Sequence, residues 1–197
     1  MIVKNIRVEP SLDNVLIRLG YKRTETGRID KEPLLKELKK AGAFTDAVYV
    51  YRDVPVKISG SEIGLGKTAL ESKSLARLLK DCTYATVFFA TIGPGLEKRS
   101  SKLMEKKAEP EALLLDAIGS EWAEALAEFI QERTRMRAEK KGFKIKHRFS
   151  PGYGDLGLSE QRRLYTLCDA GKIGIELTAD NFMVPLKSVS AVIGWYR

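Results

Sequence analysis

The sequence predicts an α+β fold in which helices flank a largely antiparallel sheet. Segments typical of helices and of strands are mixed along the 197 residues, without the regular strand–helix–strand period of a parallel sheet. Residues 84–92, YATVFFATI, are the most hydrophobic strand-like segment and are expected at the centre of the sheet. With 44% hydrophobic and 30% charged residues, the composition is that of a soluble globular protein, and we expect residues 1–197 to form a single domain.

The first 110 residues contain both strand-like and helix-like segments. Besides the central strand, strands are predicted over residues 2–8 and 47–58, the second turning at Pro55. Helices are predicted over residues 11–19, 31–41 and 71–80, and from Gly93-Pro94-Gly95 to about residue 107. Ser11 is the expected N-terminal cap of the first helix, which ends at Gly20.

One long helix is predicted from Pro110 to about Lys141. Apolar side chains spaced by three or four residues form a stripe that we expect to be buried: Leu115, Ile118, Trp122, Leu126 and Phe129. A short strand over residues 143–149 and a helix from the cap Ser159 to about residue 170 should follow it. Residues 173–177 and 184–195 are expected to close the fold as a hairpin or strand pair.

The net charge of +8 favours an acidic partner. Much of the excess lies between Arg133 and Arg148, a basic run that could meet nucleic acid or an acidic protein surface. A solvated helix end, favoured by the helix dipole, is the simpler interpretation.

Residues suited to metal binding or disulfide formation are scarce. His147 is the only histidine, and the two cysteines, Cys82 and Cys168, form no CxxC pattern. We therefore expect no metal site and no disulfide framework. No apolar run reaches the ~18 residues of a membrane span, and the N-terminus has no signal pattern, so a cytoplasmic protein is expected.

Two glycine-containing segments fail the tests for nucleotide binding. In Gly64-Leu65-Gly66-Lys67-Thr68 the first glycine of a P-loop would fall at Ser61, so a turn before the next helix is the better interpretation. The segment Gly93-Pro94-Gly95 has Lys98 where a dinucleotide loop needs its third glycine, and its proline removes an N–H donor.

The segment RFSPGYG, residues 148–154, combines side chains that a plain turn does not need. Arg148 can bind a carboxylate through two hydrogen bonds, Gly152 lets the backbone approach a ligand, and Tyr153 offers a ring and a hydroxyl. This set suits a small zwitterionic ligand with a ring, although a turn with an exposed arginine is the alternative. Glu124 lies about 180° from Leu115 on a helical wheel, so it should point away from the core, as an exposed glutamate would.

Three segments resemble the activation (reactivation) domain of cobalamin-dependent methionine synthase. RFSPGYG is similar to the family's R-x-x-x-G-Y signature, and residues 174–191 are similar to its G-x-x-L-T-x-x-F-x-M-x-P-x-x-S-V-S-G segment. WAEALAEFIQERTR is similar to the family's long-helix segment, which carries a glutamate at the position of Glu124. The motif-bearing part covers about residues 115–197, and residues 1–110 match no motif.

The resemblance implies a twisted, mainly antiparallel α+β domain that binds S-adenosylmethionine (AdoMet). It implies that Arg148 holds the AdoMet carboxylate, that Ser150 offers backbone contacts to the adenine and that Gly152 allows close approach. Tyr153 would stand near the sulfonium methyl group, and Glu124 would contact the ligand. The family carries a tyrosine pair after its S-V-S-G strand that also contacts AdoMet. Here either Tyr196 substitutes for that pair or this wall of the site is missing. The family's N-terminal aspartate has no assignable position.

These implications predict an activation subunit for a methionine synthase or a related corrinoid protein, as part of a methyltransferase system. The chain contains no D-x-H-x-x-G motif, so we expect cobalamin to be carried by a partner and the chain to act in trans. A flavodoxin- or ferredoxin-like protein would supply the electron that reduces Co(II) cobalamin. The alternatives are a basic nucleic-acid-binding protein and an AdoMet-binding protein without activation activity.

Overall fold

The computed structural model describes all 197 residues and contains a seven-stranded antiparallel sheet. Its strands follow the order β4-β3-β2-β5-β9-β6, and β1 pairs with β2. Their bounds are β1 Ile2–Val3, β2 Val48–Ser59, β3 Glu62–Leu65, β4 Thr68–Glu71, β5 Cys82–Thr91, β6 Lys144–Ile145 and β9 Ser188–Tyr196. A separate hairpin is formed by β7 Glu176–Leu177 and β8 Met183–Val184. The predicted central strand is confirmed, because β5 lies between β2 and β9.

The structure contains six α-helices. Their bounds are α1 Leu12–Arg18, α2 Glu32–Gly42, α3 Lys73–Leu79, α4 Gly95–Glu105, α5 Glu109–Glu139 and α6 Gln161–Cys168. Short 3-10 turns occupy Thr26–Arg28, Leu158–Glu160 and Ala170–Ile173. The predicted cap of α1 is confirmed, because the Ser11 side chain accepts a hydrogen bond from the Asn14 amide.

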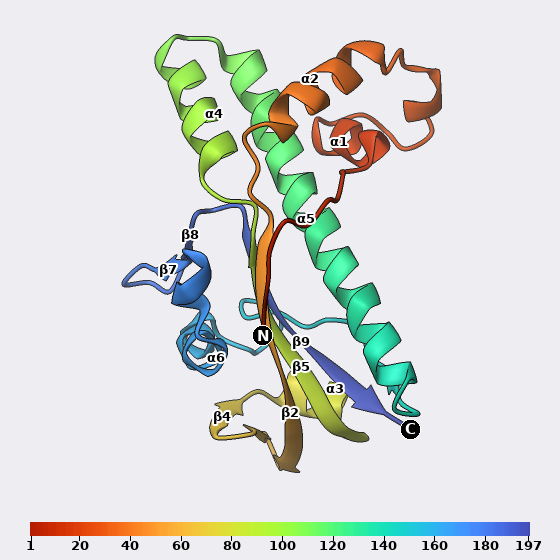
Figure 1. Cartoon of the computed structure of the whole chain (residues 1–197), viewed down its shortest axis with the longest axis vertical. Helices are drawn as coiled ribbons and strands as arrows, with labels where there is room; N and C mark the ends of the chain where they lie inside the picture. The colour runs from red at the N-terminus through yellow and green to blue at the C-terminus, as the bar shows by residue number, and fades with distance from the viewer.

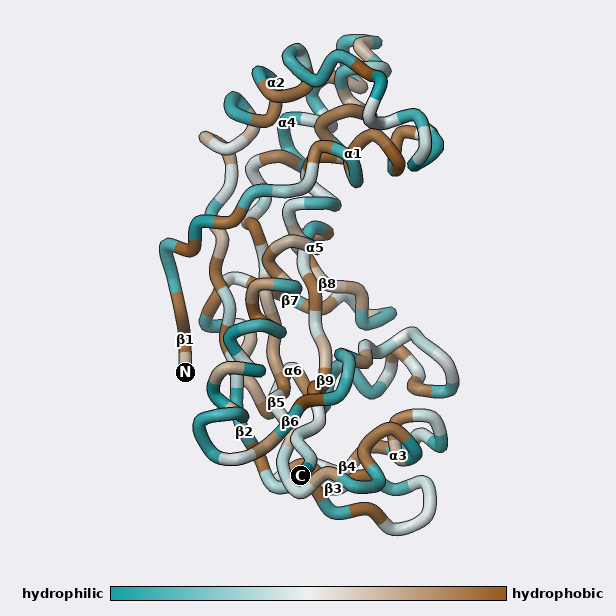
Figure 2. Tube along the Cα trace, turned by 90° about the vertical axis from the view of Figure 1, so that its right-hand side faces the viewer, coloured by the Kyte–Doolittle hydropathy of each residue, from teal (hydrophilic) through white to brown (hydrophobic).

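The long helix α5 connects two ends of the molecule. Helices α1, α2 and α4 gather around its N-terminal half, and its C-terminal half lies along the sheet near β9 and β6 (Figure 1). Seen from the side, the chain forms an arc with α1 and α2 at one end and β3, β4 and α3 at the other (Figure 2). None of the helices is both long and apolar enough to cross a membrane.

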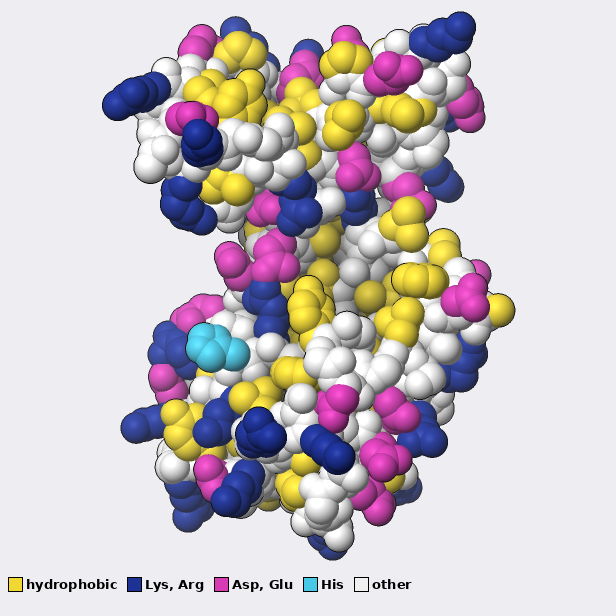
Figure 3. Space-filling model, turned by 180° about the vertical axis from the view of Figure 1, so that it is seen from behind, with side chains coloured by type: hydrophobic (Ala, Val, Ile, Leu, Met, Phe, Trp, Pro, Cys, Tyr) yellow, Lys and Arg dark blue, Asp and Glu magenta, His cyan; other side chains and the backbone are white.

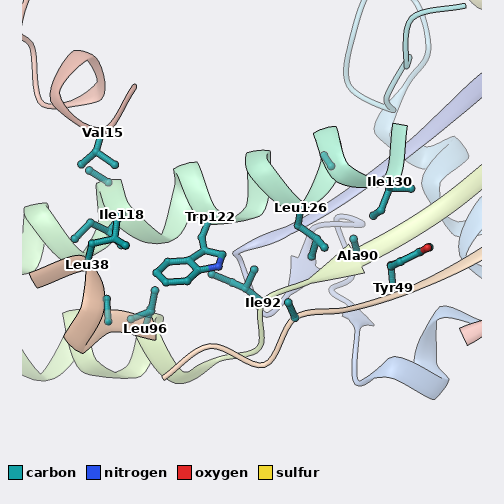
Figure 4. Close-up of a cluster of buried hydrophobic side chains, with 14 of the residues drawn as sticks. Val15, Leu38, Tyr49, Ala90, Ile92, Leu96, Ile118, Trp122, Leu126 and Ile130 are labelled. Carbon is teal, nitrogen blue, oxygen red and sulfur yellow. The ribbon is translucent and has the colours of Figure 1, made fainter. Parts of the chain in front are cut away.

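Each face of the sheet buries its own hydrophobic cluster. Helix α5 covers one face, and side chains of α1, α2 and α4 extend this cluster around the N-terminal half of α5, where Trp122 packs near Leu38, Ile92 and Leu96 (Figure 4). Side chains of α3 and α6 cover the other face. Burying one such large apolar side chain contributes about 1.5–3 kcal/mol, so the two clusters hold β5 and β9 firmly between them. The predicted stripe of α5 is buried as far as Leu126, whereas Phe129 is half-buried and Ile130 continues the stripe.

The predicted turn at Pro55 is wrong. Strand β2 continues through this residue, which pairs with Tyr84 of β5. The Pro55 carbonyl accepts a hydrogen bond from the Gly66 amide, on the side of β2 that carries β3. The N–H that proline lacks would point to that same side, just beyond the residues that pair with β3. No hydrogen bond between β2 and β5 is therefore lost.

The segment GLGKT forms a hairpin turn rather than a connection directly before a helix. Gly66, at φ +61°, turns the chain between β3 and β4, and α3 begins only after β4 has ended. The Ser72 side chain caps α3 by accepting a hydrogen bond from the Leu75 amide.

The C-terminal segments pair differently from the predicted closing pair. Residues 176–177 pair with β8, whereas β9 begins only at Ser188 and pairs with β5 along its length. Strand β9 is buried on both faces, and only a position inside the sheet covers both.

Candidate functional site

A cavity of about 570 Å³ lies between α5, the loop after β6, the start of α6 and the start of β9. Its walls combine apolar side chains with a few polar ones: Glu124, Arg148, Phe149, Ser150, Pro151, Tyr153, Leu158, Gln161, Phe182, Met183, Leu186, Ser188, Val189 and Ser190. Seen from behind, the molecular surface is hollowed between its helical end and its sheet end, and hydrophobic side chains gather there (Figure 3). Such concave, largely apolar sites with a few polar groups are typical of ligand pockets.

The cavity lies where one edge of β9 has no neighbouring strand. Strand β6 pairs only with the last residues of β9, and Phe149 bridges to Val192 through two hydrogen bonds of 2.9 Å. Because backbone groups in an antiparallel strand alternate between its two edges, Ser190 and Ser188 present theirs on the same side as Val192. The cavity is therefore built where β9 has N–H and C=O groups to offer a ligand.

The loop of residues 148–154 is held in a compact turn. The Gly152 amide donates to the Leu156 carbonyl at 2.8 Å, and Gly152 has a φ of +90°, which favours glycine. The Tyr153 amide donates to the Ser150 carbonyl at 3.2 Å. This geometry brings Ser150 and Tyr153 to the cavity while leaving the Tyr153 side chain 69% exposed.

Asp155 ties this loop to the start of α3. Its carboxylate accepts hydrogen bonds from the Ser72 hydroxyl at 2.6 Å, the Lys73 amide at 2.7 Å and the Ser74 amide at 3.0 Å. These hydrogen bonds, with the Ser72 hydroxyl foremost, hold the pKa of Asp155 far below its usual value. The loop is thus fixed at both of its ends, by Phe149 on β9 and by Asp155 on α3.

Arg148 and Glu124 both line the cavity and form an ion pair there. The Arg148 side chain is 23% exposed and the Glu124 side chain is 38% exposed. Burial lowers the pKa of Arg148, opposed by Tyr153, but a guanidinium stays charged at any physiological pH. The Arg148 amide donates to the Gln131 side chain at 3.3 Å, which holds the arginine against α5. The cavity wall therefore presents one positive and one negative group side by side.

The cavity also has polar groups that carry no charge. Gln161, the first residue of α6, is only 2% exposed, and its side-chain oxygen accepts a hydrogen bond from the Ser190 hydroxyl at 2.9 Å. Its side-chain nitrogen donates to the Asn181 carbonyl at 2.6 Å. Charged and neutral polar groups thus line one cavity whose remaining walls are mostly apolar.

The structure brings together most of the site residues that the sequence predicts. Glu124, Arg148, Ser150 and Tyr153 line the cavity, and Gly152 lies in the turn between two lining residues. Tyr196 does not line it: it lies six residues beyond Ser190 on β9, roughly 20 Å along an extended strand. Its ring lies 4.2 Å from the Lys146 ammonium group instead.

Sequence reasoning missed several lining residues. Gln161 and Ser190 received no role, and neither did the apolar side chains Phe182, Met183 and Leu186. Most of these lie in residues 174–191, the segment that already resembled the family. That resemblance was the available signal for them, whereas nothing in the sequence pointed to Gln161.

Comparisons with known proteins agree with this architecture. A family model described as the vitamin B12 dependent methionine synthase activation domain matches residues 73–196. A solved structure, the MetH reactivation domain bound to AdoHcy, superposes with a TM-score of 0.72 at 16% sequence identity. The match covers 98% of this chain and 78% of that one, so it also includes the N-terminal residues that the family model leaves out. No curated protein has a sequence that matches this chain significantly.

The fold similarity confirms the predicted α+β class with its twisted, mainly antiparallel sheet. The family model spans more than half of the sequence and includes the loop of residues 148–154, the start of α6 and β9. On this evidence the chain belongs to the family of vitamin B12-dependent methionine synthase activation domains.

Proposed function

We propose that this chain binds AdoMet in the cavity and supports the reductive methylation of Co(II) cobalamin. The cobalamin would be carried by a methionine synthase or a related corrinoid protein, with the chain acting in trans. The observation that carries the proposal is the Arg148–Glu124 pair in the wall of a mostly apolar cavity, in a chain of this family. The similar solved structure was bound to AdoHcy, which is AdoMet without its transferable methyl group.

The ion pair is suited to the amino-acid end of AdoMet, which carries both a carboxylate and an ammonium group. The planar guanidinium of Arg148 can bind the carboxylate through two parallel hydrogen bonds. Glu124 is the matching acceptor for the ammonium group. In the absence of ligand the two side chains neutralise each other, so neither charge is left half-buried without a partner.

The mouth of the cavity carries large apolar side chains that are exposed. Tyr153 is 69% exposed, Phe182 is 58% exposed and Leu186 is 63% exposed. An exposed apolar rim of this kind favours contact with another molecule. We place the partner's cobalamin at this rim, with the Tyr153 side chain between it and the sulfonium methyl group.

A flavodoxin- or ferredoxin-like protein would supply the electron that reduces the partner's Co(II) cobalamin, and the cobalamin would supply the acceptor for the methyl group, whose bond to the sulfonium sulfur breaks and leaves AdoHcy. The contribution of this chain is to hold the methyl donor in a fixed position and orientation, which removes much of the entropic barrier to transfer. The loop of residues 148–154 suits this role, because Phe149 and Asp155 anchor it.

Much of the basic run has internal contacts, which weakens the nucleic-acid alternative. Arg135 pairs with Glu132 and Glu139, and Arg137 pairs with Asp53 while stacking over Tyr51. These guanidinium groups are engaged, so fewer of them are free to contact phosphates than the sequence alone suggests.

Calorimetric titration with AdoMet and with AdoHcy tests binding. The activation step is tested by mixing the chain, AdoMet, a reductant and a corrinoid partner, and following the Co(II) absorbance. Methylation that depends on this chain supports the proposal. Binding without any change in the Co(II) spectrum of corrinoid partners would instead favour the AdoMet-binding protein without activation activity.

A further inference from the structure

Gln161 is a buried side chain whose hydrogen-bonding capacity is only half used. Its oxygen can accept two hydrogen bonds and accepts one, from the Ser190 hydroxyl. Its NH₂ group can donate two and donates one, to the Asn181 carbonyl. Because Gln161 is only 2% exposed, water has little access to its unused donor and acceptor. The residue also lines the cavity. One donor and one acceptor therefore remain for whatever occupies the cavity.

The orientation of this amide is fixed by its neighbours. The Asn181 carbonyl can only accept a hydrogen bond, so it must face the NH₂ group and not the oxygen of Gln161. Asn181 is itself held, because its amide donates to the Thr178 carbonyl at 3.0 Å and its side chain accepts from Arg162 at 3.1 Å. The amide therefore cannot rotate by 180° to suit a ligand with the opposite pattern.

We propose that Gln161 determines the specificity of the cavity for adenine, by accepting a hydrogen bond from the exocyclic amino group (N6) and donating one to the ring nitrogen N7. A glutamine amide makes this two-bond contact with adenine in protein–DNA complexes, where donor and acceptor lie side by side. The inference rests on the proposed binding of AdoMet, and adds the residue that selects the base.

The rest of the cavity is compatible with this assignment. Leu158 and Phe182 supply apolar surface beside Gln161, and a flat ring needs such surface on its faces. Ser150 can contact the ring from the opposite loop through its backbone, as the family resemblance implies. Arg148 and Glu124 take no part in this contact and stay available for the amino-acid end of AdoMet.

Hypoxanthine provides the discriminating ligand. It has a carbonyl oxygen where adenine has the amino group, whereas N7 accepts a hydrogen bond in both bases. Because the Gln161 amide cannot turn over, its oxygen would face the carbonyl oxygen of hypoxanthine, and one of the two hydrogen bonds would be replaced by a repulsive contact. S-inosylhomocysteine, which differs from AdoHcy only in its base, should therefore bind the unmutated protein roughly tenfold to a hundredfold more weakly.

The experiment measures the dissociation constants of AdoHcy and S-inosylhomocysteine by calorimetry, for the unmutated protein, Gln161→Met and Gln131→Met. Gln161→Met should bind AdoHcy more weakly and lose most of the preference for adenine. Gln131→Met is the matched control, because Gln131 is a part-buried glutamine that contacts the Arg148 backbone amide. It should retain the preference even if both ligands bind more weakly.

Three results would overturn the inference. If the unmutated protein bound both ligands with equal affinity, the inference would be wrong whatever the variants show, while the proposed AdoMet site would stand. Equal weakening of both ligands by Gln161→Met would assign the residue a structural role only. No binding of AdoHcy by the unmutated protein would remove the proposed function together with the inference.

Discussion

Arg148 and Glu124 form an ion pair that joins the loop after β6 to the middle of α5. Both side chains line the same cavity, and both are partly shielded from water. A buried charge without a partner is costly, so each residue constrains what the other can bind. A ligand that carries both a carboxylate and an ammonium group can replace the pair without leaving either charge alone.

AdoMet should stabilise the folded protein. A ligand at 100 times its dissociation constant adds roughly 2.7 kcal/mol to the free energy of unfolding. For a chain of this size that corresponds to a rise of about 5–10 °C in the melting temperature. Differential scanning calorimetry with and without AdoMet measures it, with adenosine as the control for the nucleoside part alone. An unchanged melting temperature at millimolar AdoMet would contradict the proposed site.

Arg148→Lys should weaken AdoMet while the fold stays intact. A lysine ammonium group cannot form the two parallel hydrogen bonds that a guanidinium makes with a carboxylate. A charge-assisted contact contributes ~1.5–3 kcal/mol, so affinity should fall roughly tenfold to a hundredfold. Arg135→Lys, on the exposed side of α5 and paired with Glu132 and Glu139, is the matched control. If both variants bind AdoMet equally well, Arg148 is not a ligand-binding residue.

Glu124→Gln should weaken AdoHcy by about tenfold, because the ligand's ammonium group loses a charged acceptor. An AdoHcy analogue without the amino group should show no such loss, and the released Arg148 could even bind it more tightly. Glu128→Gln, an exposed glutamate of the same helix, serves as the control. Calorimetric titration of both ligands gives the comparison, and an equal loss for both would argue against a contact with the ammonium group.

Tyr153→Phe should separate binding from methyl transfer. The ring is retained and only the hydroxyl is lost, so the affinity for AdoMet should change no more than a few-fold. Methylation of a Co(II) partner should fall further than binding does, since the residue acts mainly in the assembled complex. Cobalamin absorbance measures the rate, and calorimetry measures binding. A proportional fall in both would make Tyr153 a binding residue only.

Asp155→Asn should destabilise the protein at neutral pH by weakening three hydrogen bonds to the start of α3. The pKa of Asp155 is lower in the folded protein than the ordinary value of about 3.9, so its carboxylate stabilises the fold above that pH. The contribution is lost as the pH falls below the unfolded value toward the folded one. Urea unfolding at several pH values should therefore show a gap between the two proteins that is constant above about pH 5 and narrows below about pH 4.

Asp13→Asn provides the contrast for this pH series. Its pKa is also lowered, chiefly by a hydrogen bond from Lys31, but it lies in α1 at the opposite end of the molecule. Its variant should show a similar pH dependence of stability without affecting AdoMet binding. Asp155→Asn should affect both, because the loop it anchors contributes Ser150 and Tyr153 to the cavity.

The sequence by itself determined the elements with strong local signals. The apolar spacing of α5 and the hydrophobic run of β5 each specify one element, and burial of both faces of β5 requires a central position. The chemistry of Arg148 and the turn at Gly152 are local too, since a guanidinium and a glycine keep their properties in any fold. The structure reproduced the predicted long helix, the central strand and the turn at Gly152, whereas the ligand-binding role of Arg148 stays a prediction.

Only the tertiary structure decided which of these residues meet. The helical wheel showed that Glu124 points away from the core, but its distance from Arg148 depends on where the chain returns after α5. Gln161 gave no sequence signal, because its orientation depends on Ser190 and Asn181, far along the chain. The position of Tyr196 outside the cavity was also decided by the tertiary structure. Strand β9 must lie inside the sheet to bury both its faces, and its length then carries Tyr196 away from Ser190.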